Sequence, residues 1–158
     1  MATAMTPLSQ AAIIDTNVFV YALYPASPHY RAAFHLREQA QDPTAEFYVT
    51  AQILAEFYAT VTNPRRVDPP LSVEQALREV NNIQALDGLT ILPIPVEVVT
   101  RWIELARQHQ IRRSDIFDTQ IVATMLENAI RRIYTFNVDD FIRYTGIEVV
   151  MPLAPRRL

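Results

Sequence analysis

The sequence of 158 residues lacks cysteine and lysine, and it contains only 2 glycines and 3 histidines. Two glycines are too few for the Gly-rich loops that hold nucleotide phosphates, and without lysine neither a Schiff base nor a P-loop lysine can form. The absence of cysteine excludes thiol catalysis, disulfides and Cys-rich zinc sites, and the histidines at positions 29, 35 and 109 lack zinc-ligand spacing. Any catalysis must therefore use carboxylates, hydroxyls, arginine or a hard metal ion.

The composition is that of a globular domain, with 50% hydrophobic and 20% charged residues. The length predicts a single domain over residues 1–158, with a core at about 12–151. The net charge of -3 argues against binding a polyanion through overall charge. No permanently basic side chain precedes Arg31, and no apolar run approaches the roughly 20 residues that cross a bilayer, so we expect a cytoplasmic protein without a membrane partner.

Short runs rich in β-branched and aromatic residues alternate with longer stretches of helical spacing. The runs predict strands at 12–15, 47–50, 89–92, 132–136 and 148–151. The longer stretches predict helices at 29–40, 51–62, 72–86 and 96–108, and one more that begins near Ser114 or Asp115. This alternation predicts an α/β fold, a three-layer α/β/α sandwich around a central, mostly parallel five-stranded sheet. In such sheets the functional groups lie at the carboxyl ends of the strands.

Several acidic residues stand in apolar surroundings, where a charge is costly. Asp15 follows a run of apolar residues, Glu56 and Asp118 lie within apolar helical stretches, and a further acidic segment begins where the fourth strand ends. Carboxylates that converge at one edge of a sheet repel one another unless they are protonated or neutralised by a cation. Oxygen ligands without His or Cys favour Mg²⁺ or Mn²⁺, and such ions support hydrolysis of phosphodiesters. The residues therefore favour a metal-dependent nuclease.

Two pairs of residues lie beside these acids in the sequence and are expected to assist them. Thr16 and Asn17 follow Asp15 directly and can orient a water molecule or a ligating carboxylate. Arg112 and Arg113 precede Asp118 and can hold phosphates through paired hydrogen bonds.

Four segments, taken in order, resemble the PIN-domain family and in particular the VapC-type toxins of bacterial toxin–antitoxin pairs. The segments are 13–19, 50–58, 118–124 and 135–141, and the resemblance covers about residues 12–151. It implies a Mg²⁺-dependent endoribonuclease with RNA as its substrate, inhibited by a small antitoxin protein and usually a homodimer. It also implies that Asp15, Glu56 and Asp118 occupy the first three acidic positions, with Asp15 and Asp118 as direct metal ligands.

The fourth acidic position of the family is less well matched. One form of its motif would place an acid where this chain has Asn137, whereas another form begins at Thr135 and places the acid at Asp140. Asp139 is the weaker candidate, and an Asn can still present a carbonyl oxygen to a metal or a water molecule. Asp115 lies one helical turn before Asp118 and can share its face.

Two other classes of protein remain to be compared with the nuclease. Phosphohydrolases and receiver-type domains also place an Asp after the first strand, but they need a lysine near the phosphate and this chain has none. A catalytically degenerate PIN-like module that binds RNA or a protein is the second alternative. Asn137 supports it, because one form of the family motif has an acid at this position. The presence of Asp15, Glu56 and Asp118 weighs against that alternative.

Overall fold

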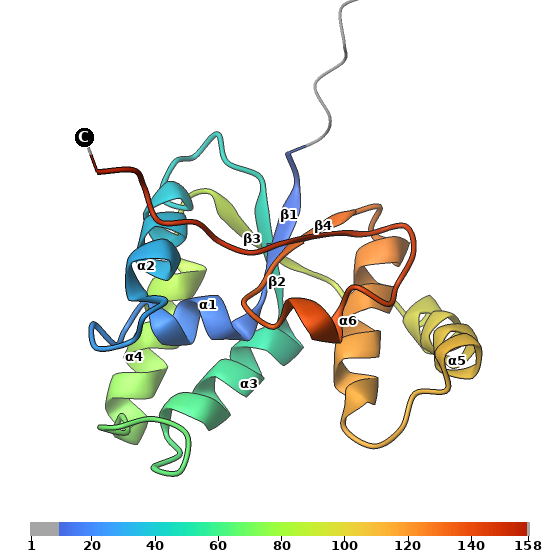
Figure 1. Ribbon diagram of the computed structural model, residues 1–158, viewed down its shortest axis with the longest axis horizontal. Coiled ribbons are helices and arrows are strands. Elements are labelled where there is room, and N and C mark those ends of the chain that lie inside the picture. The colour runs from blue at the N-terminus through green and yellow to red at the C-terminus, as the bar shows by residue number, and fades with distance from the viewer. Residues whose placement is uncertain (1–9, 158) are drawn as a thin grey trace, which may run out of the picture.

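The computed structural model describes residues 10–157, which build a five-stranded sheet between two layers of helices (Figure 1). The strands are β1 (Ala12–Ile14), β2 (Phe47–Thr50), β3 (Leu89–Leu92), β4 (Arg132–Tyr134) and β5 (Glu148–Val150). Their order in the sheet is β3-β2-β1-β4-β5, and every neighbouring pair is parallel. The predicted α/β fold with a five-stranded sheet is thus confirmed, and the sheet is parallel throughout.

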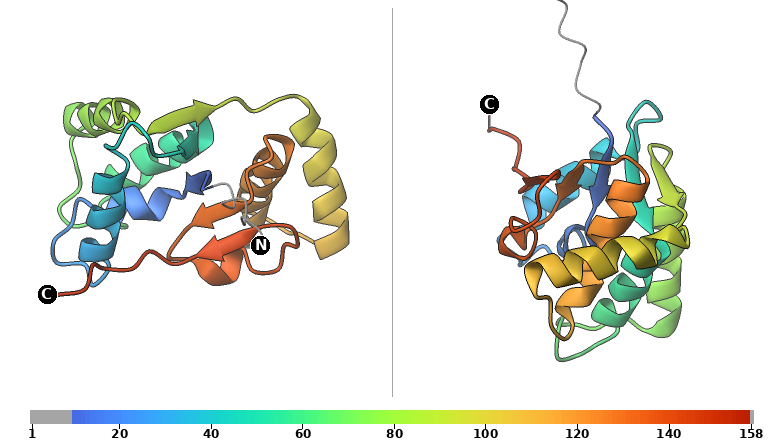
Figure 2. Two further views of the ribbon diagram at one scale, coloured as in Figure 1. Left: turned by 90° about the horizontal axis from the view of Figure 1, so that it is seen from above. Right: turned by 90° about the vertical axis from the view of Figure 1, so that its right-hand side faces the viewer.

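The helices divide between the two faces of the sheet. They are α1 (Thr16–Tyr21), α2 (Tyr30–Gln39), α3 (Ala51–Val61), α4 (Val73–Gln84), α5 (Glu97–His109), α6 (Asp115–Glu127) and the 3₁₀ helix η1 (Val138–Asp140). Because crossovers between parallel strands are right-handed, moving outward from β1 to β2 and β3 places α1 to α4 on one face. The return from β3 to β4 places α5 and α6 on the other face (Figures 1 and 2). These are the three predicted layers.

The core is formed by the strands together with the helices that lie directly on them. All three residues of β1 are buried, as expected for a central strand covered on both faces. Helix α6 is buried around most of its circumference because it lies on the sheet and is itself covered by α5. Within the described residues, no helix combines the length and the apolar character that crossing a membrane requires.

The main difference from the predicted elements lies immediately after β1. The first strand was expected to include Asp15, but it ends at Ile14, and Asp15 is instead the N-cap of the unpredicted helix α1. Helix α1 escaped prediction because it is short and its residues Val18, Phe19 and Val20 are typical of strands. The fourth strand also ends early, at Tyr134, and Ser114 precedes α6 without a capping hydrogen bond from its side chain.

The turns after the central strands lie at one edge of the sheet. Beyond β1 the chain crosses to the α1 face, whereas beyond β4 it passes through η1 on the opposite face, so the two connections diverge. This divergence between neighbouring strands opens a crevice at their carboxyl ends, the usual place for a ligand in open parallel sheets. Asp15 follows β1 and Thr135 follows β4 at this point.

Candidate active site

Asp15 is the most deeply buried acid of the crevice, with only 6% of its surface exposed. Its backbone N–H donates to the carbonyl of Tyr134, which extends the β1–β4 pairing by one residue and fixes the position of its Cα. Its Oδ1 accepts a hydrogen bond of 2.8 Å from the backbone N–H of Thr16, the capping contact of α1. The fold therefore holds this carboxylate in one orientation.

The second oxygen of Asp15 is held by two side chains from different elements. Thr135 Oγ1 donates to Asp15 Oδ2 at 2.8 Å, and Asn17 Nδ2 donates to the same oxygen at 3.2 Å. Asn17 also donates to Thr135 Oγ1 at 3.1 Å and accepts from the backbone N–H of Phe136. Asn17 and Thr135 thus join the ends of β1 and β4 and orient Asp15 between them, as polar groups behind a ligating carboxylate do.

Glu56 is brought to the crevice by α3, which begins where β2 ends. Thr50 caps this helix, its Oγ1 accepting from the backbone N–H of Ile53 at 3.2 Å. Glu56 Oε1 accepts a hydrogen bond of 2.8 Å from Gln52 Nε2, and Thr16 Oγ1 lies 3.5 Å from Glu56 Oε2. Glu56 is thereby oriented from its own helix and reached from α1.

Asp118 lies in the first part of α6 and faces the same crevice from the opposite layer. Burial, and after it the charges of Asp15, Asp140 and Glu56, together raise the pKa of its carboxyl to about 7. Burial also raises the pKa of Asp15 to about 6, although the hydrogen bonds from Thr135 and Thr16 act in the opposite direction. These shifts show that the carboxylates repel one another in a poorly solvated place.

The acids line one cleft with a volume of about 490 Å³. Asp15, Glu56, Asp118 and Asn137 all contribute to its wall, together with Thr16 and Asn17. Four segments that are far apart in the sequence therefore meet at one point, at the carboxyl edge of the sheet.

The fourth acidic position falls on the segment that follows β4. Asn137 lines the cleft, and its backbone N–H donates to Thr135 Oγ1 at 3.0 Å. Asp140, at the end of η1, raises the pKa of both Asp15 and Asp118 through its charge. Asp139 precedes it on the same short helix and is exposed. Asn137 and Asp140 are thus the two residues of this segment that the structure connects with the other acids.

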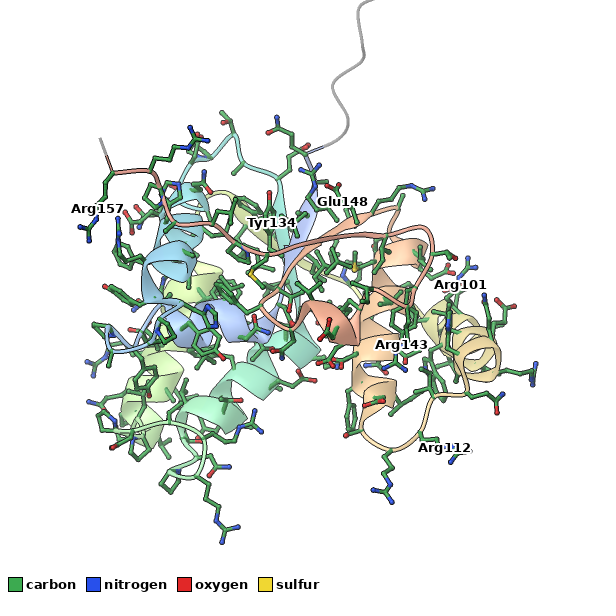
Figure 3. All side chains as sticks on the ribbon, in the orientation of Figure 1. Arg101, Arg112, Tyr134, Arg143, Glu148 and Arg157 are labelled. Atoms are coloured by element: carbon green, nitrogen blue, oxygen red, sulfur yellow. The ribbon has the colours of Figure 1, made fainter. Side chains whose placement is uncertain are left out.

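Three further residues singled out in the sequence lie outside the cleft wall. Asp115 is exposed and pairs with Arg143 at 3.6 Å, while its charge contributes to the raised pKa of Asp118. Arg112 and Arg113 are exposed on the loop before α6 and are not among the residues that line the cleft. Figure 3 shows Arg112 on this loop, away from the end of the sheet, and Arg143 beside α6.

The donor atoms of the cleft fit a hard divalent ion. Asp15, Asp118 and the amide of Asn137 offer oxygen ligands, and positive charge there would relieve the repulsion that raises the pKa of Asp118. Within the part of the chain that the structure describes, no three His, Asp or Glu side chains are arranged to hold one ion. Two carboxylates are enough for Mg²⁺, which keeps several waters among its ligands.

Two residues of the site were not singled out from the sequence. Gln52 donates to Glu56 and to the carbonyl of Phe117, and it accepts from Gln120, so it connects α3 with α6. Arg66, on the loop after α3, lines the cleft. Gln52 lies one helical turn before Glu56, which was the available signal. Nothing in the local sequence distinguishes Arg66 from Arg65.

Comparison with known proteins agrees with this fold. The model of the PIN domain family matches residues 12–147, most of the chain. The chain therefore belongs to the PIN domain family. No curated protein matches the chain by sequence.

Solved structures with the same fold include several toxin–antitoxin proteins. VapC20 of Mycobacterium tuberculosis, described as a Sarcin-Ricin loop cleaving toxin, is similar with a TM-score of 0.67 and 18% identity, over 90% of this chain and 100% of that one. VapBC2 of Rickettsia felis, bound to a DNA fragment from its promoter, is similar with a TM-score of 0.64 and 17% identity, over 89% of this chain and 98% of that one. A toxin–antitoxin complex from Klebsiella pneumoniae is similar with a TM-score of 0.60 and 19% identity, over 92% of this chain and 100% of that one. At these identities the likeness establishes the fold.

Proposed function

We propose that this protein is a Mg²⁺- or Mn²⁺-dependent endoribonuclease that hydrolyses RNA phosphodiester bonds. The observation that carries the proposal is the meeting of Asp15, Glu56 and Asp118 in one cleft, with the pKa of Asp15 and Asp118 raised by burial and by the neighbouring charges. Membership of the PIN domain family supports it, as does the absence of lysine, cysteine and a histidine pair that another mechanism would need.

Asp15 and Asp118 are the residues that would hold the ion, one from each side of the sheet. When bound, a divalent ion supplies positive charge that stabilises the phosphorane-like transition state and makes water a better nucleophile. Thr135 and Asn17 keep Asp15 Oδ2 in place, so that carboxylate needs no reorganisation during the reaction.

Glu56 is placed to orient the attacking water and to take up its proton. Glu56 lines the cleft; its Oε1 accepts a hydrogen bond from Gln52, whereas its Oε2 has only the long contact of 3.5 Å with Thr16. Oε2 is therefore the atom at which the proton would be held. Asn137 completes the polar wall on the β4 side, Asp140 adds negative charge close to it, and the two residues would help to order water there.

A cleavage assay on structured RNA tests this function. Wild-type protein with Mg²⁺ or Mn²⁺ should cut RNA, and EDTA should stop the reaction. Asp15→Asn and Glu56→Gln should each lower the rate by roughly a hundredfold or more, because each removes a group that acts on the reacting atoms. Glu74→Gln, an exposed change on α4, is the matched control and should retain full activity. Cleavage that persists in EDTA would contradict the proposal.

We further propose that the protein is the toxin of a toxin–antitoxin pair and is inhibited by a small antitoxin protein. The similarity in fold to VapC20 and to the Klebsiella toxin–antitoxin complex motivates this proposal. The acidic cleft suits an inhibitor that inserts a cation, most simply an arginine, among the carboxylates. A short open reading frame immediately upstream, whose product restores growth to cells that express this chain, would support it; a harmless chain without such a neighbour would oppose it.

The degenerate binding module remains the alternative function, and the homodimer remains a proposal about assembly. Wild-type protein that binds RNA with Mg²⁺ present but never cuts it would favour the module. Light scattering of the purified protein tests the dimer, for which a mass near twice 18.1 kDa is expected.

A further inference from the structure

A second groove, of about 480 Å³, lies beside the acidic cleft. Glu56, Ala59 and Asp118 line both hollows, so the groove and the cleft lie on either side of the same carboxylates. A polymer whose phosphate is in the cleft must pass out of it on at least one side. The shared residues make the groove a continuation of the path that the cleft begins.

The groove differs from the cleft in chemical character. Its wall includes Phe117, which is 55% exposed although it stands next to Asp118, and its floor includes Ala55 of α3. What distinguishes this ring is its place, next to Asp118 and on the wall of the groove that adjoins the acidic cleft. Bases of single-stranded RNA stack on exposed aromatic rings whatever their identity, because every base has a π-face.

Arg66 lies at the other end of this path. It is the one basic residue among the described residues that line the cleft, and it stands on the loop that follows α3. It belongs to none of the ion pairs formed between described residues, so its guanidinium is available to a ligand. A guanidinium binds phosphate oxygens through two parallel hydrogen bonds. In a cleft walled by carboxylates, Arg66 is the group that can attract a phosphate directly.

Helix α3 connects these two ends. Glu56 and Ala59 face both hollows, Ala55 faces the groove, and Thr60 faces the cleft. From Gln52 to Thr60 this face is about 12 Å long. Ala55 and Ala59 are exposed and small, so a strand can approach the helix closely between the polar residues.

We propose that the RNA strand lies along this face of α3, with a phosphate held by Arg66 and the base of a nucleotide on the other side of the scissile bond stacked on Phe117. This proposal rests on the proposed ribonuclease function and adds the path of the substrate to it. Arg66 and Phe117 are binding residues that position the strand; the acids between them perform the hydrolysis.

Steady-state cleavage of a fluorogenic single-stranded RNA of mixed sequence tests the part of Arg66. Arg66→Ala should raise KM roughly tenfold while kcat changes little, since a charge-assisted hydrogen bond to the bound strand is lost. Arg66→Lys should recover part of this loss. Arg65→Ala, the neighbouring exposed arginine, is the control and should leave KM unchanged. Equal KM values for Arg66→Ala and Arg65→Ala would show that Arg66 does not bind the RNA strand.

An RNA oligonucleotide containing 2-aminopurine tests the part of Phe117, since the fluorescence of this base is quenched when it stacks. The binding experiment uses the Asp15→Asn background, so that the RNA stays intact. Quenching should occur when Phe117 is present and also in Phe117→Trp. In Phe117→Leu the quenching should be lost, and the affinity for RNA should fall roughly tenfold. Phe34→Leu, a change at another exposed phenylalanine, should have no effect.

The outcomes separate this inference from the proposed function. If wild-type protein cuts RNA while Phe117→Leu and Arg66→Ala behave like their controls, the path along α3 is wrong and the nuclease stands. If wild-type protein cuts no RNA but the oligonucleotide is still quenched by Phe117, the binding path stands and the nuclease fails. If Phe117→Leu leaves RNA binding intact and abolishes inhibition by a protein partner, the groove is a protein-docking surface and the proposal is overturned.

Discussion

At the scale of single residues, the two proposed metal ligands differ in how the protein holds them. Asp15 is buried, but Thr135, Asn17 and the backbone of Thr16 donate hydrogen bonds to it and offset part of the cost of burial. The raised pKa of Asp118 comes from burial and from the repulsion of neighbouring acids. Asp118 is thus the carboxylate whose charge is most costly to the metal-free protein.

We predict that Asp118→Asn stabilises the metal-free protein. In the unfolded chain the Asp pKa is near 3.8, whereas in the folded protein it is about 6 for Asp15 and about 7 for Asp118. Between these values the folded state binds more protons than the unfolded state, so in EDTA the stability of the wild type should fall as pH rises toward 7 and then level off. The stability of Asp118→Asn should fall less over the same pH range.

The expected gain of Asp118→Asn at pH about 8 is about 1 kcal/mol, less than the full pKa shift would give, because Asp118 is partly exposed and solvent screens its charge. Chemical denaturation in EDTA at several pH values measures it. Millimolar Mg²⁺ should reverse the order by stabilising only the wild type. A variant less stable than the wild type in EDTA at high pH would contradict this prediction.

We predict that Thr135→Val weakens both stability and metal binding. The hydrogen bond from Thr135 lowers the pKa of Asp15, so its loss should raise that pKa further and leave more of the carboxyl protonated at neutral pH. The substitution also removes one of the two acceptors of Asn17 Nδ2, the other being Asp15 Oδ2, and takes away the acceptor of the Asn137 backbone N–H, at a cost of about 1–2 kcal/mol in the free energy of unfolding.

Thermal unfolding with and without Mg²⁺ measures both effects of Thr135→Val. Thr145→Val, at an exposed position, is the matched control. If the variant gains as much stability from Mg²⁺ as the wild type does, Thr135 does not support the site.

At the scale of elements, the residue at which a strand ends matters more for the site than the length of the strand. Strands β1, β2 and β4 were predicted from their β-branched and aromatic residues, and the structure contains each of them. The prediction placed Asp15 inside β1, because alternation of residues cannot show where a strand stops and a cap begins. The orientation of the carboxylate depends on this capping contact and on Thr135, which follows β4 and is 120 residues away in the sequence.

The two glycines provide a test at this scale, since they serve different physical needs. A Cβ at Gly88 would meet the carbonyl oxygen of Asp42 at an impossibly short distance and Ala45 Cβ at 2.8 Å. Gly146 has a φ of 85°, and a Cβ there would make only ordinary van der Waals contacts, the nearest being 3.9 Å from a methyl carbon of Leu126. Gly88 is therefore required by the packing of the turn before β3 against the loop before β2, and Gly146 by its backbone conformation.

We predict that Gly88→Ala costs more than 2 kcal/mol, roughly the cost of overpacking against backbone, whereas Gly146→Ala costs about 1 kcal/mol. Denaturation midpoints of the two variants measure the difference. Because the turn at Gly88 lies outside the cleft, the folded fraction of Gly88→Ala should retain its activity. Equal costs for the two substitutions would show that the close contacts at Gly88 are relieved easily.

At the scale of the whole molecule, charge sets the condition for binding RNA. The net charge is -3, and the cleft concentrates acids at the place where a phosphate must bind. The metal-free cleft should therefore repel RNA, and a divalent ion should reverse this.

We predict that RNA binds at least roughly tenfold more tightly with millimolar Mg²⁺ than with EDTA. Fluorescence anisotropy of labelled RNA at constant ionic strength measures this in the Glu56→Gln background, which slows cleavage. The double variant Asp15→Asn, Asp118→Asn is the control for general screening, and its affinity should depend little on the ion. Equally tight binding in EDTA and Mg²⁺ would show that the acids do not govern access.

The sequence by itself determined the class of fold and predicted the candidate acids, three of which line one cleft in the structure. The alternation of strands and helices requires a parallel sheet, and the absence of lysine, cysteine and paired histidines leaves carboxylates as the available chemistry. The tertiary structure decided which polar residues join those acids. It brought Gln52 to Glu56 and Arg66 to the cleft, left Arg112 and Arg113 on an exposed loop, and connected Asp140 with Asp15 and Asp118. Local sequence records burial and helical or strand periodicity, whereas the position of a loop arginine depends on where distant elements pack.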